Sequence, residues 1–216
     1  MPRRWLEEHR RDHYYRLAKK EGYRSRAAFK LLQASRKYNL IKRGDAVVDL
    51  GAAPGGWIQV ARMLVGDKGY VLGVDLNPIK RFDLSNVDAI VADITNLKTL
   101  DSIIERLPRK ADAVVSDVSQ NVSGIWELDH ARQIDLAKAS LRIATSSLHT
   151  GGNFLTKAFQ GSLLNDFVKE VKRHFKFVRI FKPKASRSSS SEVYIVAISK
   201  KKTPNNDSKV NSFSSQ

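Results

Sequence analysis

Apolar residues fall in short runs through the middle of the chain, and stretches with helical periodicity separate these runs. Most runs are continuous rather than alternating, as in parallel strands that are covered on both faces. The pattern predicts strands at residues 46–50, 70–76, 89–93, 113–117, 153–159, 176–181 and 193–199. It predicts helices at residues 26–38, 56–65, 97–107, 128–148 and 163–174.

This alternation predicts an α/β fold with a doubly wound, mostly parallel seven-stranded sheet. The last two predicted strands are joined by the segment KPKASRSSSSE, which has no helical pattern. We therefore expect these two strands to pair antiparallel and to close one edge of the sheet. A dinucleotide-binding fold does not predict such a hairpin.

The chain is strongly basic, which indicates the class of its partner. Its 216 residues, enough for one domain with appendages, contain 38 Lys and Arg against 22 Asp and Glu, a net charge of +16. This excess implies a polyanionic partner such as nucleic acid or an anionic membrane surface, and nothing supports the membrane, because no apolar stretch approaches the ~20 residues of a spanning helix. No apolar run of a signal peptide begins the chain, so we expect a cytoplasmic protein. With no Cys, disulfides, cysteine zinc sites and cysteine nucleophiles are excluded.

The charge is unevenly distributed along the chain. Residues 1–43 hold 14 basic and 4 acidic side chains, a net charge of +10, whereas residues 44–216 hold 24 and 18, a net charge of +6. We interpret residues 1–43 as a basic, helical RNA-binding segment of the same domain as residues 44–202. The polar tail, residues 203–216, is expected to be disordered.

A second basic stretch, without any acid, contains Lys172, Arg173, Lys176, Arg179, Lys182, Lys184 and Arg187. A charge run is usually a solvated surface, but two basic segments around a more neutral middle favour a surface that follows phosphates.

A glycine-rich loop follows the first predicted strand, in the sequence DLGAAPGGW from Asp49 to Trp57. Ligands bind at this carboxyl edge in open α/β sheets. The loop matches neither the phosphate-binding P-loop nor the G-x-G-x-x-G loop of dinucleotide sites, so a nucleoside without phosphates fits better. Asp75 ends the next strand, and its carboxylate can accept hydrogen bonds from both ribose hydroxyls of a nucleoside. Asp93 can accept a hydrogen bond from an adenine amine, while Ile94 packs on the adenine ring. A lone Asp is more often a cap, but three acids at successive strand ends favour a nucleoside site.

These residues resemble the FtsJ/RrmJ family of RNA 2'-O-ribose methyltransferases. The similarity covers about residues 10–200 and includes YRSRAAFKL, DLGAAPGGW, GVDL, ADI, SD, FLTK and SSEVY in the family's order. It implies a methyltransferase version of the fold and S-adenosylmethionine as the methyl donor. The implied cofactor-binding residues are Gly51, Pro54, Gly55, Gly56, Trp57, Asp75, Asp93, Ile94 and Asp117.

The resemblance also implies a catalytic tetrad of Lys30, Asp117, Lys157 and Glu192. A 2'-hydroxyl must lose its proton as it attacks the methyl group, and Lys157 is our candidate to accept or steer that proton. A free lysine keeps its proton at neutral pH. A second ammonium nearby and burial lower the pKa of a lysine, whereas nearby carboxylates raise it. The sequence thus leaves open whether Lys157 is neutral beforehand or stabilises the developing alkoxide. Taken singly, each tetrad residue fits an exposed surface position; together with the glycine loop they favour a site.

One position departs from the family pattern. After SD the family commonly has a small residue, Pro and Asn-x-Ser-Gly, whereas this chain has Gln120 in place of the proline. Loss of the fixed φ predicts a less constrained loop, with an effect on substrate choice rather than on activity.

The leading hypothesis is methyl transfer to a ribose of structured RNA, with a uridine of large-subunit (23S) ribosomal RNA as the first substrate and the transfer RNA anticodon loop as the second. The alternative is an RNA-binding or ribosome-assembly factor without turnover; a nucleotide-dependent oxidoreductase is disfavoured by the glycine spacing. We expect a monomer that uses no metal, since the five histidines show no ligand spacing. Trp5, Tyr14 and Tyr15 either stack on bases or pack into the core. Candidate phosphate-binding residues are Arg4, Arg10, Arg11, Arg24, Arg26 and Lys37.

Overall fold

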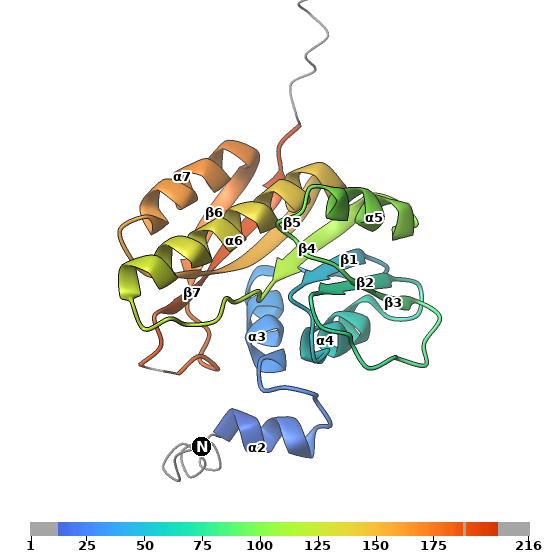
Figure 1. Ribbon diagram of the computed structural model, residues 1–216. Coiled ribbons are helices and arrows are strands. Elements are labelled where there is room, and N and C mark those ends of the chain that lie inside the picture. Colours follow the sequence, from blue (N-terminus) through green and yellow to red (C-terminus); the bar gives the residue numbers. More distant parts are fainter. Residues whose placement is uncertain (1–12, 188, 203–216) are drawn as a thin grey trace, which may run out of the picture.

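The computed structural model describes residues 13–187 and 189–202 (Figure 1). Two helices precede the sheet, α2 (His13–Lys20) and α3 (Ala28–Tyr38). The remaining helices are α4 (Gly56–Val65), α5 (Lys98–Arg106), α6 (Trp126–Ser147) and α7 (Leu164–His174). The strands are β1 (Ala46–Leu50), β2 (Tyr70–Asp75), β3 (Val87–Val91), β4 (Ala111–Ser116), β5 (Leu148–Phe159), β6 (Phe175–Phe181) and β7 (Glu192–Lys200).

The seven strands form one sheet in the order β3-β2-β1-β4-β5-β7-β6. Pairs from β3 to β5 are parallel, and β7 is antiparallel to both of its neighbours, β5 and β6. The predicted doubly wound fold and its antiparallel pair are therefore confirmed. The edge strand is β6, because β7 lies between β5 and β6.

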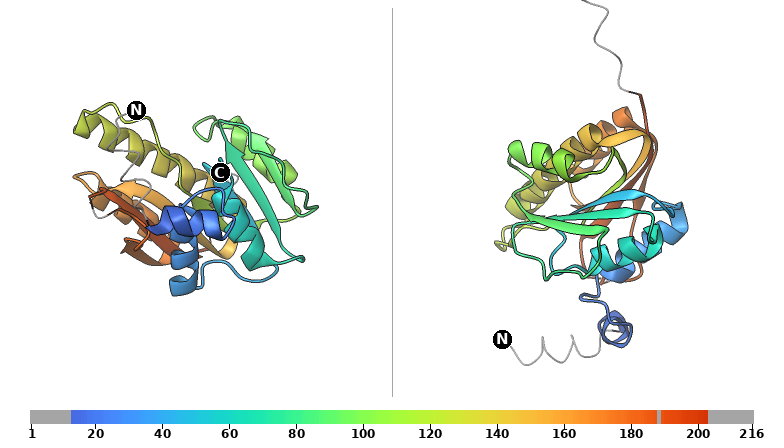
Figure 2. Two further views of the ribbon diagram at one scale, coloured as in Figure 1. Left: turned by 90° about the horizontal axis from the view of Figure 1, so that it is seen from below. Right: turned by 90° about the vertical axis from the view of Figure 1, so that its right-hand side faces the viewer.

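Helices cover both faces of the sheet, which explains the continuous apolar runs of the sequence. Figures 1 and 2 show α5, α6 and α7 on one face and α3 and α4 on the other. Each face has its own buried core, one around Val48, Phe154 and Ile195 and one around Val47, Leu155 and Tyr194. Strand β1 is buried along its whole length.

Some element bounds differ from the sequence-based prediction. Strand β3 lies two residues earlier than predicted, because its pairing with β2 sets Val87 opposite Val71. Asp93 is consequently beyond the strand rather than at its end. Strand β5 begins at Leu148, five residues before the predicted start, since a register shift lets the strand continue through Gly151 and Gly152.

The described part of the basic segment, residues 13–43, packs onto the α/β body. Helix α3 buries Phe29, Leu31 and Leu32 in the core that also contains Val47. Helix α2 lies farther out, beyond α3 (Figure 1), and buries Ala18. Of the helices in the described ranges, none combines the length and apolar character needed to cross a membrane.

Candidate active site

The four residues of the predicted tetrad come from four different elements. Lys157 lies on β5 directly opposite Tyr194 of β7, and Glu192 precedes Tyr194 by two residues on the same face of β7. Asp117 follows β4 at the next position to Ser116, and Lys30 extends from α3. The sheet and the helix that covers it therefore direct all four side chains to one place.

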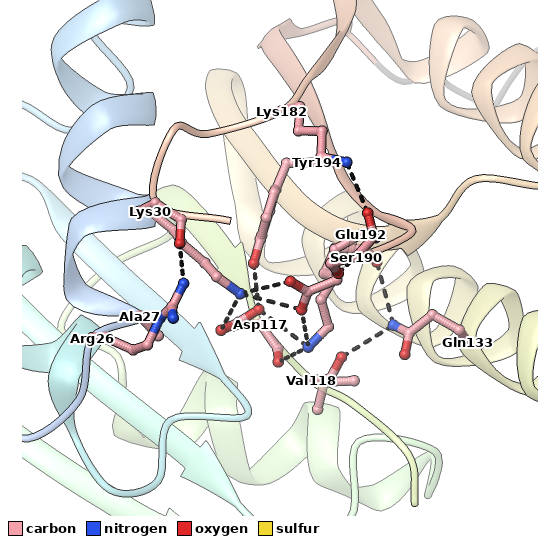
Figure 3. A network of polar contacts seen from close by, with 12 residues as sticks. Arg26, Ala27, Lys30, Asp117, Val118, Gln133, Lys182, Ser190, Glu192 and Tyr194 are labelled. Atoms are coloured by element: carbon pink, nitrogen blue, oxygen red, sulfur yellow. Dashed lines mark hydrogen bonds and ion pairs between the residues drawn. The ribbon is translucent and has the colours of Figure 1, made fainter. Parts of the chain in front are cut away.

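The tetrad is a closed network of ion pairs (Figure 3). Lys30 Nζ lies 3.0 Å from Glu192 Oε2 and 4.0 Å from Asp117 Oδ2. Lys157 Nζ lies 3.2 Å from Asp117 Oδ1 and 3.8 Å from Glu192 Oε1, and it donates to the Asp117 carbonyl at 2.8 Å. Lys157 is only 4% exposed and Lys30 8%, so both lysine side chains depend on these partners.

Tyr194 adds a hydroxyl that the sequence analysis missed. Its OH donates to Asp117 Oδ1 at 2.6 Å. Burial, followed by the charges of Asp117 and Glu192, raises the pKa of Tyr194 well above its usual value, so the phenol keeps its proton. Burial alone would raise the pKa of Asp117, but Lys157, Lys30 and this hydroxyl together lower it. Asp117 is thus a carboxylate over the whole neutral range.

A first cleft of about 460 Å³ opens at the carboxyl edge of the sheet. Five of the nine residues predicted to bind the cofactor line it: Gly51, Asp75, Asp93, Ile94 and Asp117. Asp75 accepts from the Ala53 amide at 2.9 Å and from the Asn77 amide at 2.8 Å, which fixes its carboxylate at the rim. Leu76 and Leu136 add apolar surface. The cleft therefore joins apolar walls to well-placed carboxylates, as a nucleoside requires.

The other four predicted cofactor residues, Pro54, Gly55, Gly56 and Trp57, do not line this cleft. Gly56 and Trp57 begin α4, and the Trp57 indole donates to the Ala27 carbonyl at 2.7 Å. The glycine loop is thereby tied to the N-terminus of α3, the helix that carries Lys30. This contact links the position of the loop to that of the tetrad.

Asp49 lies in β1, beneath the loop, and is completely buried. Neither carboxyl oxygen has a hydrogen-bond partner among the residues that the structure describes. Burial, followed by the charges of Asp117 and Asp75, raises the pKa of Asp49 well above its usual value. Its ionisation therefore opposes folding as the pH rises.

We expect Asp49→Asn to be more stable than the wild type at pH 8, by at least about 2 °C in Tm. The carboxyl of the unfolded chain loses its proton near pH 4, whereas the folded chain holds it to higher pH, so the wild type loses stability as pH rises above this value. The Tm difference should disappear toward pH 4 in thermal unfolding monitored by circular dichroism. Asp135→Asn, at an exposed position on α6, is the control. A difference independent of pH would exclude charge as its cause.

A second cleft, of about 410 Å³, lies on the other side of the tetrad. Lys30 and Glu192 line it together with Arg26, Arg187, Ser189 and Ser190. Arg26 donates to the Ala185 carbonyl, and burial lowers its pKa, followed by the nearby charge of Arg187. The tetrad therefore stands between two clefts, with Asp117 facing the first and Lys30 and Glu192 facing the second.

The loop after β4 is held by hydrogen bonds in place of the family's proline. Gln120 donates to the Asp129 carbonyl at 2.7 Å, and Asp129 accepts from the Ser123 amide at 2.9 Å and the Gly124 amide at 3.1 Å. Hydrogen bonds from Ser123 are the main cause that lowers the pKa of Asp129. We expected a less constrained loop; the side-chain network constrains it by other means.

Arg24, predicted to bind phosphate, is occupied within the protein. Its Nη1 donates to the carbonyls of Lys80 at 2.7 Å and Pro54 at 3.2 Å, and its guanidinium stacks 3.7 Å from the centre of the Phe82 ring. It thus fastens the segment after β2 to the glycine loop. That segment walls another cleft, of about 870 Å³, which includes no residue of the tetrad or of the first cleft.

The remaining predicted RNA contacts have different surroundings. Arg4, Arg10, Arg11 and Trp5 lie outside the described residues. Lys37 is exposed at the end of α3. Tyr14 packs against Phe29, with 5.5 Å between ring centroids, and accepts from Gln33. The described residues contain no group of three or more His, Asp or Glu arranged to hold a metal ion.

The sequence matches the family model for FtsJ-like methyltransferase over residues 23–200. The ribosomal RNA large subunit methyltransferase E of Methanocaldococcus jannaschii is 52% identical over 198 residues, 90% of this chain and 81% of the relative. Its namesake from Methanothermobacter thermautotrophicus is 51% identical over 196 residues, 91% of this chain and 93% of the relative. A crystal structure from Plasmodium falciparum, provisionally designated a ribosomal RNA methyltransferase, has a TM-score of 0.71 and 26% identity, with 82% of this chain and 98% of that chain covered. The chain therefore belongs to the FtsJ-like methyltransferase family.

Proposed function

We propose that this protein transfers the methyl group of S-adenosylmethionine to a ribose 2'-hydroxyl of ribosomal RNA. The observation that carries this proposal is the place of the tetrad between two clefts. A donor in the first cleft and a ribose in the second would meet at Asp117 and Lys157. Both clefts are thus required for a two-substrate transfer.

The residues of the first cleft fit S-adenosylmethionine. The rigid Asp75 carboxylate suits two ribose hydroxyls, Ile94 and Leu136 offer apolar contact to an adenine, and Asp93 lies beside them. The cleft volume of about 460 Å³ is within the range of small-molecule sites. When bound, this cofactor supplies an electrophilic methyl group on a sulfonium. Asp117 offers a negative charge near such a cation.

The residues of the tetrad have different roles in the reaction. The hydroxyl oxygen forms its new bond to carbon as the sulfur–carbon bond breaks, and the hydroxyl proton must leave. Lys157 Nζ is the group that accepts this proton or stabilises the developing negative charge on oxygen. Lys30 and Glu192 orient the ribose, and Tyr194 fixes Asp117 through its hydrogen bond.

Two observations support ribosomal RNA as the substrate. The curated relatives named above act, by their names, on ribosomal RNA of the large subunit. The second cleft carries Arg26 and Arg187, whose charge suits the phosphates on either side of a target ribose. Within the resemblance to the family, a uridine of the large-subunit RNA is the target that we propose.

The test is transfer of labelled methyl from S-adenosylmethionine to total RNA, protein-free ribosomal RNA, transfer RNA and large ribosomal subunits. We expect label in ribosomal RNA or in the subunit and, after digestion to nucleosides, in 2'-O-methyluridine. Label in transfer RNA would change the substrate, and label on a base would overturn the role of the tetrad. Cofactor binding without any transfer would favour a ribosome-assembly factor.

A further inference from the structure

A basic and aromatic surface lies where α3 meets the edge strand β6. We name it the α3–β6 surface and define it by Lys37, Tyr38, Phe177, Arg179, Phe181 and Lys184. The Tyr38 ring centroid lies 6.5 Å from that of Phe177 and 5.5 Å from that of Phe181, so the two elements are in contact here. Sequence analysis identified the basic stretch but not its apposition to α3.

Cations cover the aromatic rings of this surface. The guanidinium of Arg179 lies 4.5 Å from the centre of the Phe177 ring, and Lys37 Nζ lies 5.2 Å from that of Phe181. Phe177 is 39% exposed, although it belongs to a strand. An exposed aromatic ring next to several cations, with the half-buried rings of Tyr38 and Phe181 beside it, is a combination that binds single-stranded nucleic acid through stacking and phosphate contacts.

The charge of the surface has one sign. Neither α3 nor β6, nor the segment 182–187, contains an Asp or Glu. Lys37, Arg179 and Lys184 are all exposed. Cations on an edge strand commonly prevent pairing with another strand, but here the acid-free set extends beyond β6 to α3 and residues 182–187 and is therefore complementary to a polyanion.

The α3–β6 surface is continuous with the tetrad. Phe181 lies opposite Tyr194, whose hydroxyl contacts Asp117, and Lys182 donates to the carbonyl of Ser190 in the second cleft. From Phe181 to Phe177 the strand extends about 13 Å away from this point. That length spans several successive phosphates at about 3.4 Å per nucleotide of a stacked strand.

We propose that the RNA strand flanking the target nucleotide runs along the α3–β6 surface, with phosphates on Lys37, Arg179 and Lys184 and a base against Phe177. This inference rests on the proposed function, and it adds that the substrate is an extended strand held well beyond the reacting ribose. Recognition is then shared between the second cleft and this surface.

The test combines Lys37→Ala, Arg179→Ala and Lys184→Ala in one variant. The matched control combines Lys98→Ala, Arg132→Ala and Lys138→Ala, which removes the same charge from exposed positions on α5 and α6, across the sheet. Both triple variants also carry Lys157→Ala, so that no methyl transfer occurs during the measurement. Their binding to protein-free large-subunit ribosomal RNA is measured over a range of salt concentrations.

We expect the α3–β6 variant to bind RNA at least about 10-fold more weakly than the control, with a slope of log affinity against log salt that is smaller by about 2 to 3. With Lys157 restored, KM for RNA should rise while kcat stays within about 2-fold. Equal affinities and slopes in the two variants would overturn the inference and would favour a protein as the partner of this surface. Failure of the wild type to methylate any RNA would instead overturn the proposed function, which the binding comparison does not require.

Discussion

Replacing Lys157 by alanine is expected to lower the rate of methyl transfer by about 10²–10⁴-fold, the range for loss of a group that handles a proton in the transition state. Lys157 Nζ contacts Asp117 and Glu192 and is buried, so water cannot simply take its place. Binding of S-adenosylmethionine should change far less, because Lys157 does not line the first cleft. Single-turnover transfer to RNA, with cofactor affinity measured by calorimetry, checks both parts.

Lys200→Ala is the matched control for this variant. Lys200 is also a buried lysine, 7% exposed, and it donates to the backbone carbonyl of Leu148 at 2.9 Å, at the opposite end of β7 from Glu192. Both variants lose a buried ammonium and should lose stability, but only Lys157→Ala should lose activity. A Lys157→Ala enzyme within 10-fold of Lys200→Ala would exclude Lys157 from proton transfer.

Gly51→Ala is expected to weaken binding of S-adenosylmethionine by at least about 10-fold and to lower stability. The φ of Gly51 is +75°, which costs a residue with a Cβ about 1–2 kcal/mol. The new Cβ would also lie 2.7 Å from the backbone Cα of Val118, which must move. Val118 lines the first cleft, so its displacement changes the cofactor site. Calorimetric titration and thermal unfolding measure the two effects.

Gly44→Ala separates the two causes. Gly44 has a similar φ of +84°, but a Cβ there would meet no atom of residues 13–187 or 189–202 within 4 Å. This variant should therefore show only the cost of the backbone conformation, with an unchanged affinity for the cofactor. If both variants bind the cofactor equally well, contact with Val118 does not matter to the first cleft.

Local pattern was sufficient to predict the elements whose ends are marked in the sequence. Strand β1 and helix α4 have the predicted bounds, because the apolar run AVVDL stops at Gly51 and the helix starts directly at Gly56. Strand β3 was displaced because the run VDAIVADI offers no local end, and the pairing of Val71 with Val87 decides its register. Long-range pairing thus supplies what a short apolar run lacks.

The site was predictable in its charged residues but not in its partners. The resemblance identified Lys30, Asp117, Lys157 and Glu192, and the structure brings them together. Tyr194 was missed because a tyrosine in an apolar strand has the pattern of a core residue. Its spacing of two from Glu192 was the available signal, since residues i and i+2 of a strand share a face. The burial of Asp49 without hydrogen-bond partners among the described residues depends on packing, and no pattern in the sequence indicates it.

The position of β7 assigns the first cleft and the tetrad to different parts of the chain. Every residue that lines the first cleft belongs to the chain between Gly51 and Leu136, so that cleft depends on strands β1 to β4 and helix α6. Glu192 and Tyr194 instead lie on β7, which is placed between β5 and β6 and pairs with both. A chain without β7 would therefore keep every residue that lines the first cleft but would lack Glu192, one of the two carboxylates of the tetrad. The proposed donor site and the proposed site of proton transfer thus depend on different segments of the sheet.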